Sequence, residues 1–344
     1  MSPDNPIQEL EVPSLLDDLS RLLNQIPRGR VTTYGDLAEA LGDRHAARWV
    51  GEALLKHTHS ESCPCHRVVR STGDIGRYIT GNSDEKHRKL QAESIVVQGN
   101  AVNLSEYRFS DFQSDHPLLD LRKHQERIGQ QVSLKPYSKT PSLVAGVDVS
   151  YSSSTAVATL AIVETQSGKC VDSTTVKCPI SFPYISGYLA FRELPVLVRL
   201  MKQVAKIGEI PKVILVDGNG ILHHRTAGIA SHLGVVMNLR TIGVGKTLLG
   251  GTFKRKDLSP SSPQPIFWND RQVGIAVVSR KNSTPIFISP GHRIDVESSL
   301  RIVQALFHGH RLPEPLYWAD RLSRQTARKK TRIDGRSQTW TESE

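Results

Sequence analysis

The run Val144-Ala145-Gly146-Val147-Asp148-Val149-Ser150-Tyr151 decides the fold of the larger part of this chain. It is apolar and rich in valine, which is typical of a buried strand, and it carries one acid in its middle. Strand-like runs follow at 156–163 and 170–178, and a helical segment then reaches about residue 207. Strands mixed with helices predict an α/β domain with a mixed sheet. The later elements that we expect are strands at 212–216, 240–244, 273–278 and 285–288 and a helix at 296–307.

Two more acids stand out in the same part of the chain. Asp217 ends a strand-like run in Ile214-Leu215-Val216-Asp217-Gly218-Asn219-Gly220, and Glu193 lies in the helical segment. An acid within an apolar strand is costly to bury unless it is paired or bound to a metal. Two such strands that meet a third carboxylate would form an oxygen-rich site suited to Mg²⁺, which can activate water for phosphodiester cleavage. On spacing alone, salt-bridged or helix-capping acids remain the other interpretation.

The first part of the chain has a different pattern. Thr33-Tyr34-Gly35-Asp36 has the spacing of a capping box and begins a short helix that Gly42 ends. Asp43 is placed to cap a second helix. Two short helices joined by a tight turn predict a helix-turn-helix, whose second helix usually enters a groove of DNA, although an ordinary helical hairpin has the same spacing. Three side chains on the second helix favour DNA, namely Arg44, His45 and Arg48.

The run Ser62-Cys63-Pro64-Cys65-His66-Arg67-Val68-Val69 places a cysteine directly before a histidine. A thiolate is the reactive form of cysteine, and a neighbouring base can generate it. Taken alone, a buried cysteine beside a solvated histidine is the more ordinary interpretation. Cys63 and Cys65 are too close for an ordinary disulfide, and no second pair of cysteines has zinc spacing, so the four cysteines indicate a reducing compartment.

Length and charge set the remaining bounds. The chain has 344 residues and a formal net charge of +10, which favours a polyanionic partner without locating a site. It has no signal-peptide pattern and no apolar run of about 18 residues, so we expect no membrane association and a cytoplasmic location. Changes in pattern divide the chain into a first domain at 1–105, a linker at 106–116, a second domain at 117–323 and a basic flexible tail at 324–344.

The first domain carries several motifs in order, and together they resemble the O6-alkylguanine-DNA alkyltransferases (methylated-DNA–protein-cysteine methyltransferases) over roughly residues 10–97. The resemblance implies a mainly helical domain of winged helix-turn-helix type. It also implies that Cys65 accepts an alkyl group from O6-alkylguanine in DNA once per molecule, that His66 is the base, and that Glu93 orients it. Besides the cysteine run, the motifs are Pro27-Arg28-Gly29-Arg30-Val31-Thr32-Thr33-Tyr34-Gly35-Asp36-Leu37-Ala38, Ala47-Arg48-Trp49-Val50-Gly51, Gly73-Asp74-Ile75-Gly76-Arg77-Tyr78 and Lys89-Leu90-Gln91-Ala92-Glu93.

The same resemblance assigns three side chains to DNA. Arg48 would fill the stack that the flipped nucleotide leaves, Tyr34 would rotate the phosphate, and Tyr78 falls in the loop that covers the alkyl pocket. The chain departs from the family at His57-Thr58, where Asn-Pro is usual and supports the turn next to the active helix. Alkyltransferase-like lesion sensors carry Trp in place of the cysteine, so Cys65 favours transfer, and a non-transferring lesion-binding unit is the alternative.

The second domain resembles endonuclease V, the deoxyinosine 3′ endonuclease with a ribonuclease-H-like fold, from about 115 to 322. The resemblance implies that Asp148 and Asp217 bind Mg²⁺, that Glu193 completes the site, and that His292 is a catalytic residue near the metal. Its motifs are Phe182–Glu193, His223-His224-Arg225, Ala230-Ser231-His232-Leu233-Gly234, Gly243-Val244-Gly245-Lys246, Gly291-His292-Arg293 and Arg311-Leu312-Pro313-Glu314-Pro315, together with the two strands quoted above.

Three further side chains are assigned to DNA by this second resemblance. Lys246 and His223 would contact the DNA backbone, and Tyr184 would belong to a wedge between the strands, in which Ser186 replaces the usual proline. The two resemblances together imply a bifunctional repair protein that acts on O6-alkylguanine and deoxyinosine in DNA. A nuclease directed at inosine in RNA is the other alternative, and we expect Cys63 to be dispensable for transfer.

Overall fold

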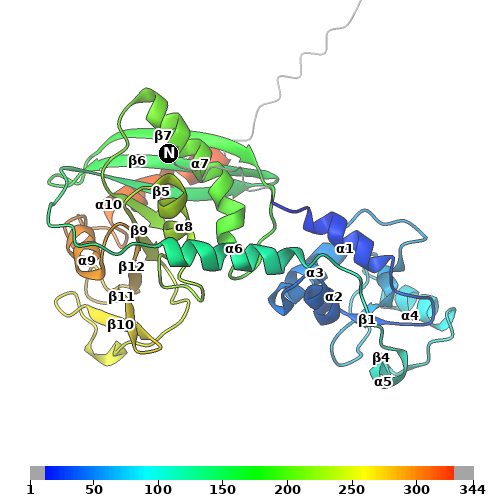
Figure 1. Ribbon diagram of the computed structural model, residues 1–344. Coiled ribbons are helices and arrows are strands. Elements are labelled where there is room, and N and C mark those ends of the chain that lie inside the picture. Colours follow the sequence, from blue (N-terminus) through cyan, green and yellow to red (C-terminus); the bar gives the residue numbers. More distant parts are fainter. Residues whose placement is uncertain (1–11, 329–344) are drawn as a thin grey trace, which may run out of the picture.

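Helix α6, Pro117–Gln131, joins two units of the chain in the computed structural model, which describes residues 12–328 (Figure 1). This helix begins where the sequence predicts that the second domain begins. Its first turn is attached to the N-terminal unit, because the backbone N–H of Leu118 donates to the carbonyl of Leu41 over 2.8 Å. Gly42 has a φ of +104° and lies against the backbone of Leu119, so a side chain at this position would be both strained and obstructed.

The N-terminal unit is mainly helical, as the sequence predicts, with two small two-stranded sheets. The capping box is confirmed, since Thr33 Oγ1 accepts from the N–H of Asp36 and the Asp36 carboxylate accepts from the N–H of Thr33, both over 3.1 Å. The elements are α1 (Leu15–Leu23), β1 (Thr32–Thr33), α2 (Tyr34–Ala40), the 3₁₀ turn η1 (Arg44–Ala46), α3 (Ala47–Leu54), the 3₁₀ turn η2 (Pro64–Arg67), β2 (Val68–Val69), α4 (Ser83–Gln91), β3 (Val97–Gln98), β4 (Ala101–Val102) and α5 (Leu104–Tyr107).

Residues 106–116, which the sequence predicts to be a linker, instead lie on the N-terminal unit. The backbone of Val31 donates to Tyr107 over 2.9 Å and accepts from Phe109 over 2.7 Å. The amide side chain of Gln25 bonds the backbone N–H and carbonyl of Gln113 over 2.8 and 2.9 Å. After α5 ends at Tyr107, the segment lacks a periodic sequence because it is held by isolated bonds to the edge of the unit and forms no further helix or long strand before α6.

The C-terminal unit is built on one eight-stranded sheet in the order β10-β11-β12-β9-β8-β5-β6-β7. β8 runs parallel to both β5 and β9 and the other pairs are antiparallel, so the mixed sheet is confirmed. We did not expect β10, an edge strand that contains Pro265, because proline disfavours a strand except at an edge. The strands are β5 (Leu143–Ser152), β6 (Thr155–Glu164), β7 (Cys170–Pro179), β8 (Ile214–Asp217), β9 (Thr241–Gly245), β10 (Gln264–Trp268), β11 (Arg271–Val277) and β12 (Ile286–His292).

Helices cover both faces of this sheet. α7 (Leu189–Ile207) and α8 (Ile229–Met237) pack on one face, and α9 (Val296–Gln304) and α10 (Glu314–Arg328) pack on the other. Successive residues of a strand point to opposite faces, so neighbouring strand residues belong to different cores. No helix within residues 12–328 is both long and apolar enough to cross a membrane.

The first residues of the expected basic tail, 324–328, are helical instead. Helix α10 continues to Arg328, Ser323 is fully buried, and Arg324 bonds Asp320 one turn earlier over 2.9 Å. Arg324 and Arg328 lie on the outer face of an amphipathic helix. A count of basic residues alone does not reveal this helix. The rest of the expected tail, 329–344, lies outside the described residues.

The two units share a buried interface. One hydrophobic cluster contains residues of α1, α2 and α3 together with Leu118, Leu121 and four aromatic or aliphatic residues near the start of α7. Within this cluster, Tyr188 is 1% exposed and its hydroxyl donates to the carboxylate of Asp43 over 2.6 Å. Asp43 also accepts from the N–H of His45, so one carboxylate both caps the turn η1, which leads into α3, and contacts the other unit.

Candidate functional sites

Three carboxylates converge where β5 and β8 lie side by side. Val147 pairs with Val216 in the parallel register, so the next residues, Asp148 and Asp217, lie level with each other. The third carboxylate is Asp320 of α10, the helix that packs against β5 and β6. Single oxygen atoms of these three groups lie within 4.8 Å of one another, a spacing that allows one metal ion to contact all three.

Burial and mutual repulsion shape the charges of this carboxylate cluster. Burial raises the pKa of Asp148 to about 7, with a further contribution from Asp217, although Ser323 donates to Asp148 over 2.5 Å and opposes the shift. Burial likewise raises the pKa of Glu193 to about 8, and the charges of Asp217 and Asp148 add to the rise. Glu193 therefore lies within electrostatic reach of the cluster, where its carboxylate accepts from the hydroxyl of Tyr151 over 2.9 Å.

Lys246 contacts the carboxylates themselves. Its ammonium group, just after β9, donates to Asp217 over 2.5 Å and to Asp320 over 3.2 Å. A cation on these oxygens offsets part of the repulsion, and a divalent ion would do so more strongly. The three oxygen donors, one of which is the Asp148 carboxylate with its raised pKa, fit a divalent metal. The expected contact of Lys246 with the DNA backbone stays a prediction, and it requires the ammonium group to leave these carboxylates.

The strand register separates His292 from the carboxylates. His292 pairs with Thr241 of β9, which pairs with Ile214 of β8, three residues before Asp217. Three strand residues span about 10 Å. The Nδ1 atom of His292 instead accepts from the backbone N–H of Ser133 over 3.2 Å. A catalytic role near the metal stays a prediction for His292, one that the register does not support.

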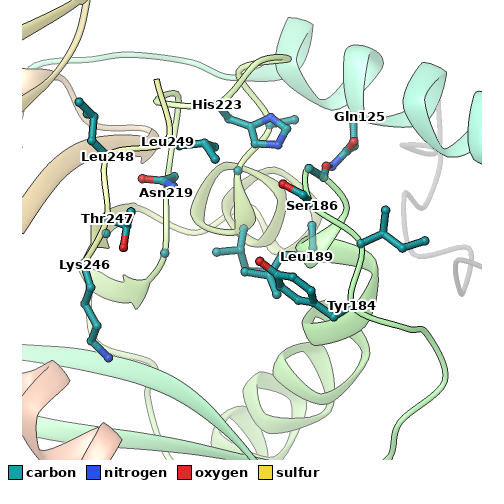
Figure 2. A pocket seen from close by; sticks show the side chains of 18 residues that line it. Gln125, Tyr184, Ser186, Leu189, Asn219, His223, Lys246, Thr247, Leu248 and Leu249 are labelled. Atoms are coloured by element: carbon teal, nitrogen blue, oxygen red, sulfur yellow. The ribbon is translucent and has the colours of Figure 1, made fainter. Parts of the chain in front are cut away.

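A pocket of about 360 Å³ is lined by Gly218, the residue after Asp217, and by Lys246, which bonds Asp217 (Figure 2). Tyr184, which is 65% exposed, stands on one wall, and Lys246 and Asn219 belong to the other. The Oδ1 atom of Asn219 is buried and has no hydrogen-bond partner within the described part of the chain, so a bound group could donate to it. Backbone packs closely here: the Cα of Gly220 faces the carbonyl of Pro290 so tightly that no Cβ fits.

Of the residues assigned to DNA by resemblance, three come to this pocket. Tyr184, His223 and Lys246 all line it, from segments far apart in the sequence. Burial lowers the pKa of His223 to about 3, so its imidazole is neutral at physiological pH. A neutral histidine can form hydrogen bonds with a phosphate or a base but contributes no charge to the attraction.

Cys65 lies on the short turn η2 in the N-terminal unit and is 6% exposed. The neighbouring His66 directs Nε2 to the Glu93 carboxylate over 2.9 Å, as the sequence predicts. Burial would raise the pKa of Glu93, but hydrogen bonds from Arg67 and His66 outweigh it and lower the pKa to about 2. Glu93 is therefore an ionised and firmly held orienter, bonded by Arg67 over 2.7 to 3.1 Å.

The imidazole that contacts the Cys65 sulfur is that of His59, over 3.5 Å, and not that of His66. The Nδ1 atom of His66 is buried and has no hydrogen-bond partner among residues 12–328. Burial lowers the pKa of His66, although Glu93 opposes the shift, so the imidazole is neutral and able to accept a proton. The structure brings together the expected His66–Glu93 pair. Within residues 12–328, the expected link from His66 to the thiol is not a direct hydrogen bond.

Sequence reasoning missed Lys86, which is 1% exposed beneath the thiol. Its ammonium group donates to the carbonyls of Val68, over 2.6 Å, and Ile75. Burial lowers the pKa of Lys86 to about 8. The contact with Cys63 and burial raise the pKa of the Cys65 thiol, and the charge of Lys86 opposes this rise. Lys86 stands in a strongly polar helix, so the sequence offers no signal that this lysine points inward.

The residues expected to reach DNA differ in exposure. The Arg48 side chain is 91% exposed on α3 and bonds only its helix neighbour Glu52, over 3.2 Å, among the contacts of the described chain. Tyr34 begins α2 and is half-buried. Tyr78 is 3% exposed, with its hydroxyl 3.4 Å from Nε2 of His59, and its place in a loop that covers an alkyl pocket stays a prediction.

Comparison with known proteins assigns both units. The family model described as Endonuclease V matches residues 126–321, and the one described as 6-O-methylguanine DNA methyltransferase, DNA binding domain, matches 17–95. The protein named bifunctional methyltransferase/endonuclease from Picrophilus torridus is 37% identical over 293 residues, which is 85% of this chain and 90% of that protein. Its namesake from Thermoplasma volcanium is 36% identical over 84% of each chain. This chain belongs to the bifunctional methyltransferase/endonuclease family.

The fold of the endonuclease V domain agrees with this assignment. The crystal structure of Ciona intestinalis endonuclease V, in complex with a 24mer DNA containing an inosine followed by a ribo-adenosine, is similar with a TM-score of 0.56 and 32% identity. The match covers 62% of this chain and 98% of that one. The family members support a DNA repair function with an alkyltransferase domain and an endonuclease V domain, and the endonuclease V family is metal-dependent.

Proposed function

We propose that this protein transfers alkyl groups from O6-alkylguanine in DNA to Cys65, once per molecule, and cleaves DNA 3′ to deoxyinosine with Mg²⁺. The observation that carries the proposal is the presence in one chain of two separate reactive centres, a buried thiol backed by an oriented histidine and a cluster of buried carboxylates. Four free cysteines also fit a reducing compartment such as the cytoplasm.

For cleavage, Asp148, Asp217 and Asp320 would hold the ion, with Glu193 beside it. Bound Mg²⁺ supplies an activated water and neutralises the charge that develops on the phosphodiester. Lys246 then has a second possible partner, because its ammonium group can turn from the carboxylates to a phosphate oxygen. The hydroxyls of Ser323 and Tyr151 keep the two most buried carboxylates, Asp148 and Glu193, in fixed orientations.

The adjacent pocket is the proposed site of the deaminated base. Its position between Tyr184 and Asn219 lets an extruded base enter beside the carboxylates while the exposed tyrosine fills the space left in the duplex. The free Oδ1 of Asn219 can accept from the N1–H of hypoxanthine, a donor that adenine lacks. The inosine-containing DNA bound to the Ciona intestinalis protein supports this substrate class.

For alkyl transfer, the Cys65 thiolate would attack the alkyl carbon. The S–C bond forms while the bond from carbon to O6 breaks, the electron pair stays on guanine, and the base takes up a proton. His66 is neutral and held by Glu93, so its Nδ1 atom can take the thiol proton through one bridging water. Lys86 stabilises the thiolate from below, and Arg48 is exposed where a winged helix-turn-helix would meet the duplex.

Mass spectrometry tests the transfer directly. After incubation with duplex DNA that contains O6-methylguanine, we expect one added methyl mass on the peptide that carries Cys65 and none on the other cysteines. Cleavage of an inosine-containing strand is measured in the same preparation with Mg²⁺ and with EDTA. An unmodified Cys65, or cleavage that persists in EDTA, would disprove the corresponding half of the proposal.

One observation favours a second candidate for the N-terminal unit, a lesion-binding module without transfer. The Cys65 sulfur contacts His59 and not the oriented His66, so the expected proton path is not direct. Under that alternative the protein would bind O6-methylguanine DNA tightly while the methyl stays on the base. For the nuclease, matched DNA and RNA strands with one inosine each decide between the two substrates, because the solved relative was bound to a substrate with a ribonucleotide next to the inosine.

A further inference from the structure

Four side chains with metal-binding atoms converge in the loop between α3 and η2. They are two histidines and two cysteines, His57, His59, Cys63 and Cys65. Each offers one ligand atom, a ring nitrogen or a sulfur, and these four atoms all lie within 4.8 Å of one another. Two contacts join them in pairs: Nε2 of His57 lies 3.2 Å from the Cys63 sulfur, and Nδ1 of His59 lies 3.5 Å from the Cys65 sulfur.

The second nitrogen of each imidazole already has a partner. Nδ1 of His57 lies 2.9 Å from the carbonyl oxygen of Leu54, which can only accept, so this nitrogen carries the proton and the lone pair of Nε2 points at sulfur. Nε2 of His59 lies 3.4 Å from the hydroxyl of Tyr78, which leaves Nδ1 free to point at the other sulfur. Histidines that bind metals are held in this way, with the outer nitrogen bonded to a carbonyl or another polar group.

We propose that His57, His59, Cys63 and Cys65 form a tetrahedral Zn²⁺ site. Two imidazole nitrogens and two thiolates are a donor set that zinc prefers. Bond lengths of about 2.3 Å to sulfur and 2.0–2.1 Å to nitrogen in a tetrahedron place such donors about 3.5 Å apart. The two observed nitrogen–sulfur distances, 3.2 and 3.5 Å, agree with this value.

The loop leaves a path for the ion to enter and for the ligands to adjust. His57, His59 and Cys63 are half-buried, and only Cys65 lies at the buried end of the cluster. Three of the donors come from a loop of irregular backbone between Leu54 and Pro64, and Cys65 follows on η2, so small shifts of the loop can close the tetrahedron around Cys65 without moving a long helix. This loop has His57-Thr58 where the alkyltransferases usually have an Asn-Pro turn, so the residue that departs from the family is one of the proposed zinc ligands.

The site has a consequence that rests on the proposed transfer, because one of its ligands is the alkyl acceptor. Zinc binds the thiolate form of Cys65, which is also the nucleophile. Transfer forms an S–C bond at that sulfur and breaks the bond from the alkyl carbon to O6, while the base takes its proton from water. The product is a neutral thioether, a weaker ligand than a thiolate, so alkylation loosens the zinc and the state of the metal reports whether the protein has been used.

Metal analysis of the full chain, purified without an affinity tag and without chelators, tests the site. We expect about one zinc per chain in the wild type and a loss of most of it in Cys63→Ser and in His57→Asn. Cys170→Ser is the matched control, since it removes a thiol on β7 far along the chain from the cluster. Asp217→Asn is the second control, because zinc held by the carboxylates would be lost in that variant alone.

Cobalt provides a readout that does not depend on the variants. Co²⁺ added to metal-free wild type should give the absorption of a tetrahedral ion together with thiolate-to-cobalt charge transfer, which only sulfur ligands produce. Far-UV circular dichroism shows whether each variant keeps its fold. Wild type without bound zinc and without the cobalt–thiolate band, or full zinc in both Cys63→Ser and His57→Asn, would overturn the proposal.

The consequence for alkylation is measured separately. After reaction with O6-methylguanine DNA, we expect zinc affinity to fall at least tenfold, about the loss that follows a disturbed metal ligand, as measured with a chromophoric chelator. Methylated Cys65 in a protein that never held zinc would refute the metal site and keep the transfer. Bound zinc in a protein that takes up no methyl would refute the transfer and keep the metal site.

Discussion

The two reactive centres of this chain are assembled in opposite ways. The carboxylate cluster takes Asp148, Asp217 and Asp320 from two strands and a helix that are distant in sequence, and the sheet register brings them level. The thiol centre takes its cysteines and their contacting histidines from one short loop, 57–65. The first therefore depends on the folding of a whole domain, whereas the second depends on the conformation of a few residues.

This difference also separates the chemistry. Hard oxygen donors on rigid strands suit a hard cation and hydrolysis, and soft sulfur and imidazole donors on an adaptable loop suit zinc and nucleophilic transfer. Neither centre contains a ligand of the other, so a substitution at one centre should abolish the activity of that centre only. The following experiments test that independence and then the points at which the two units meet.

The largest effects should come from reciprocal substitutions at the two centres. Asp217→Ala and Asp320→Ala remove a proposed ligand of the ion that stabilises the transition state by several kcal/mol, so cleavage of inosine DNA should fall on the order of 10³-fold. Cys65→Ala should abolish methyl uptake. Each variant should leave the other activity within about twofold of wild type, as measured on one preparation by gel-based cleavage and mass spectrometry.

An exposed carboxylate provides the control for this comparison. Asp172→Ala on β7 removes one negative charge away from the cluster and should cleave at the wild-type rate. Full cleavage by Asp217→Ala would remove the metal-site assignment. Loss of methyl uptake in Asp320→Ala would show that the two centres are not independent.

The fold of the larger domain could largely be predicted from its sequence because strand periodicity is local. The three long strands, the first of which carries Asp148, stand at the expected positions to within two residues. Helix α10 could not be predicted in this way, because its outer face is so basic that it has the composition of a tail. Asp320 lies on that helix ahead of the expected tail, and no strand-like or acidic motif marks it, so its place beside the other two carboxylates required the structure.

The thiol centre shows a different limit. Cys65, His66 and Glu93 could be named from motifs, and the His66–Glu93 contact is confirmed. His57 stands out in the sequence only as a departure from the family, and the spacing of the cysteines alone does not indicate a zinc site. Residue pairing across a loop depends on backbone turns that no periodic pattern encodes, so the contact of His57 with Cys63 required the structure. The expectation that Cys63 is dispensable for transfer stays a prediction.

Stability of the metal-free protein should depend on pH in a way that the metal removes. The pKa of Asp148 is raised to about 7 and that of Glu193 to about 8, above the values of an unfolded chain, so the native state binds more protons. This contribution is full below about pH 4 and is lost as pH rises through 7 to 8. We expect urea denaturation in EDTA to show a loss on the order of a few kcal/mol between pH 6 and 9.

Added Mg²⁺ and the Asp148→Asn variant distinguish the titration of these buried carboxylates from general effects of alkaline pH on stability. Mg²⁺ should restore much of the stability at about pH 9 in the wild type and little in Asp148→Asn, which has no carboxylate to titrate at that position. A metal-free wild type whose stability rises with pH over the same range would contradict the assignment of these buried carboxylates.

A smaller effect is expected at the DNA-facing surface of the thiol centre. Arg48→Ala should slow methyl transfer from duplex DNA by roughly tenfold, since its proposed task is to stabilise the flipped nucleotide, whose extrusion costs a few kcal/mol. Transfer from the free base O6-methylguanine should hardly change. Lys56→Ala, which removes one exposed positive charge just after the same helix, is the control for electrostatic attraction alone. Equal losses on duplex and free base would contradict the finger role.

The smallest effect should appear where the two units touch. Tyr188→Phe removes the hydroxyl that donates to the Asp43 carboxylate over 2.6 Å in a buried interface, and we expect it to lower the free energy of unfolding by about 1–2 kcal/mol. Asp43→Asn removes the charged acceptor, and the double variant should lose less than the sum of the two, because both single changes break the same bond. Tyr107→Phe, on α5 and away from the interface, is the matched control. Additive losses from Tyr188 and Asp43 would mean that this hydrogen bond does not hold the units together, and the two centres would then be independent in stability as well as in chemistry.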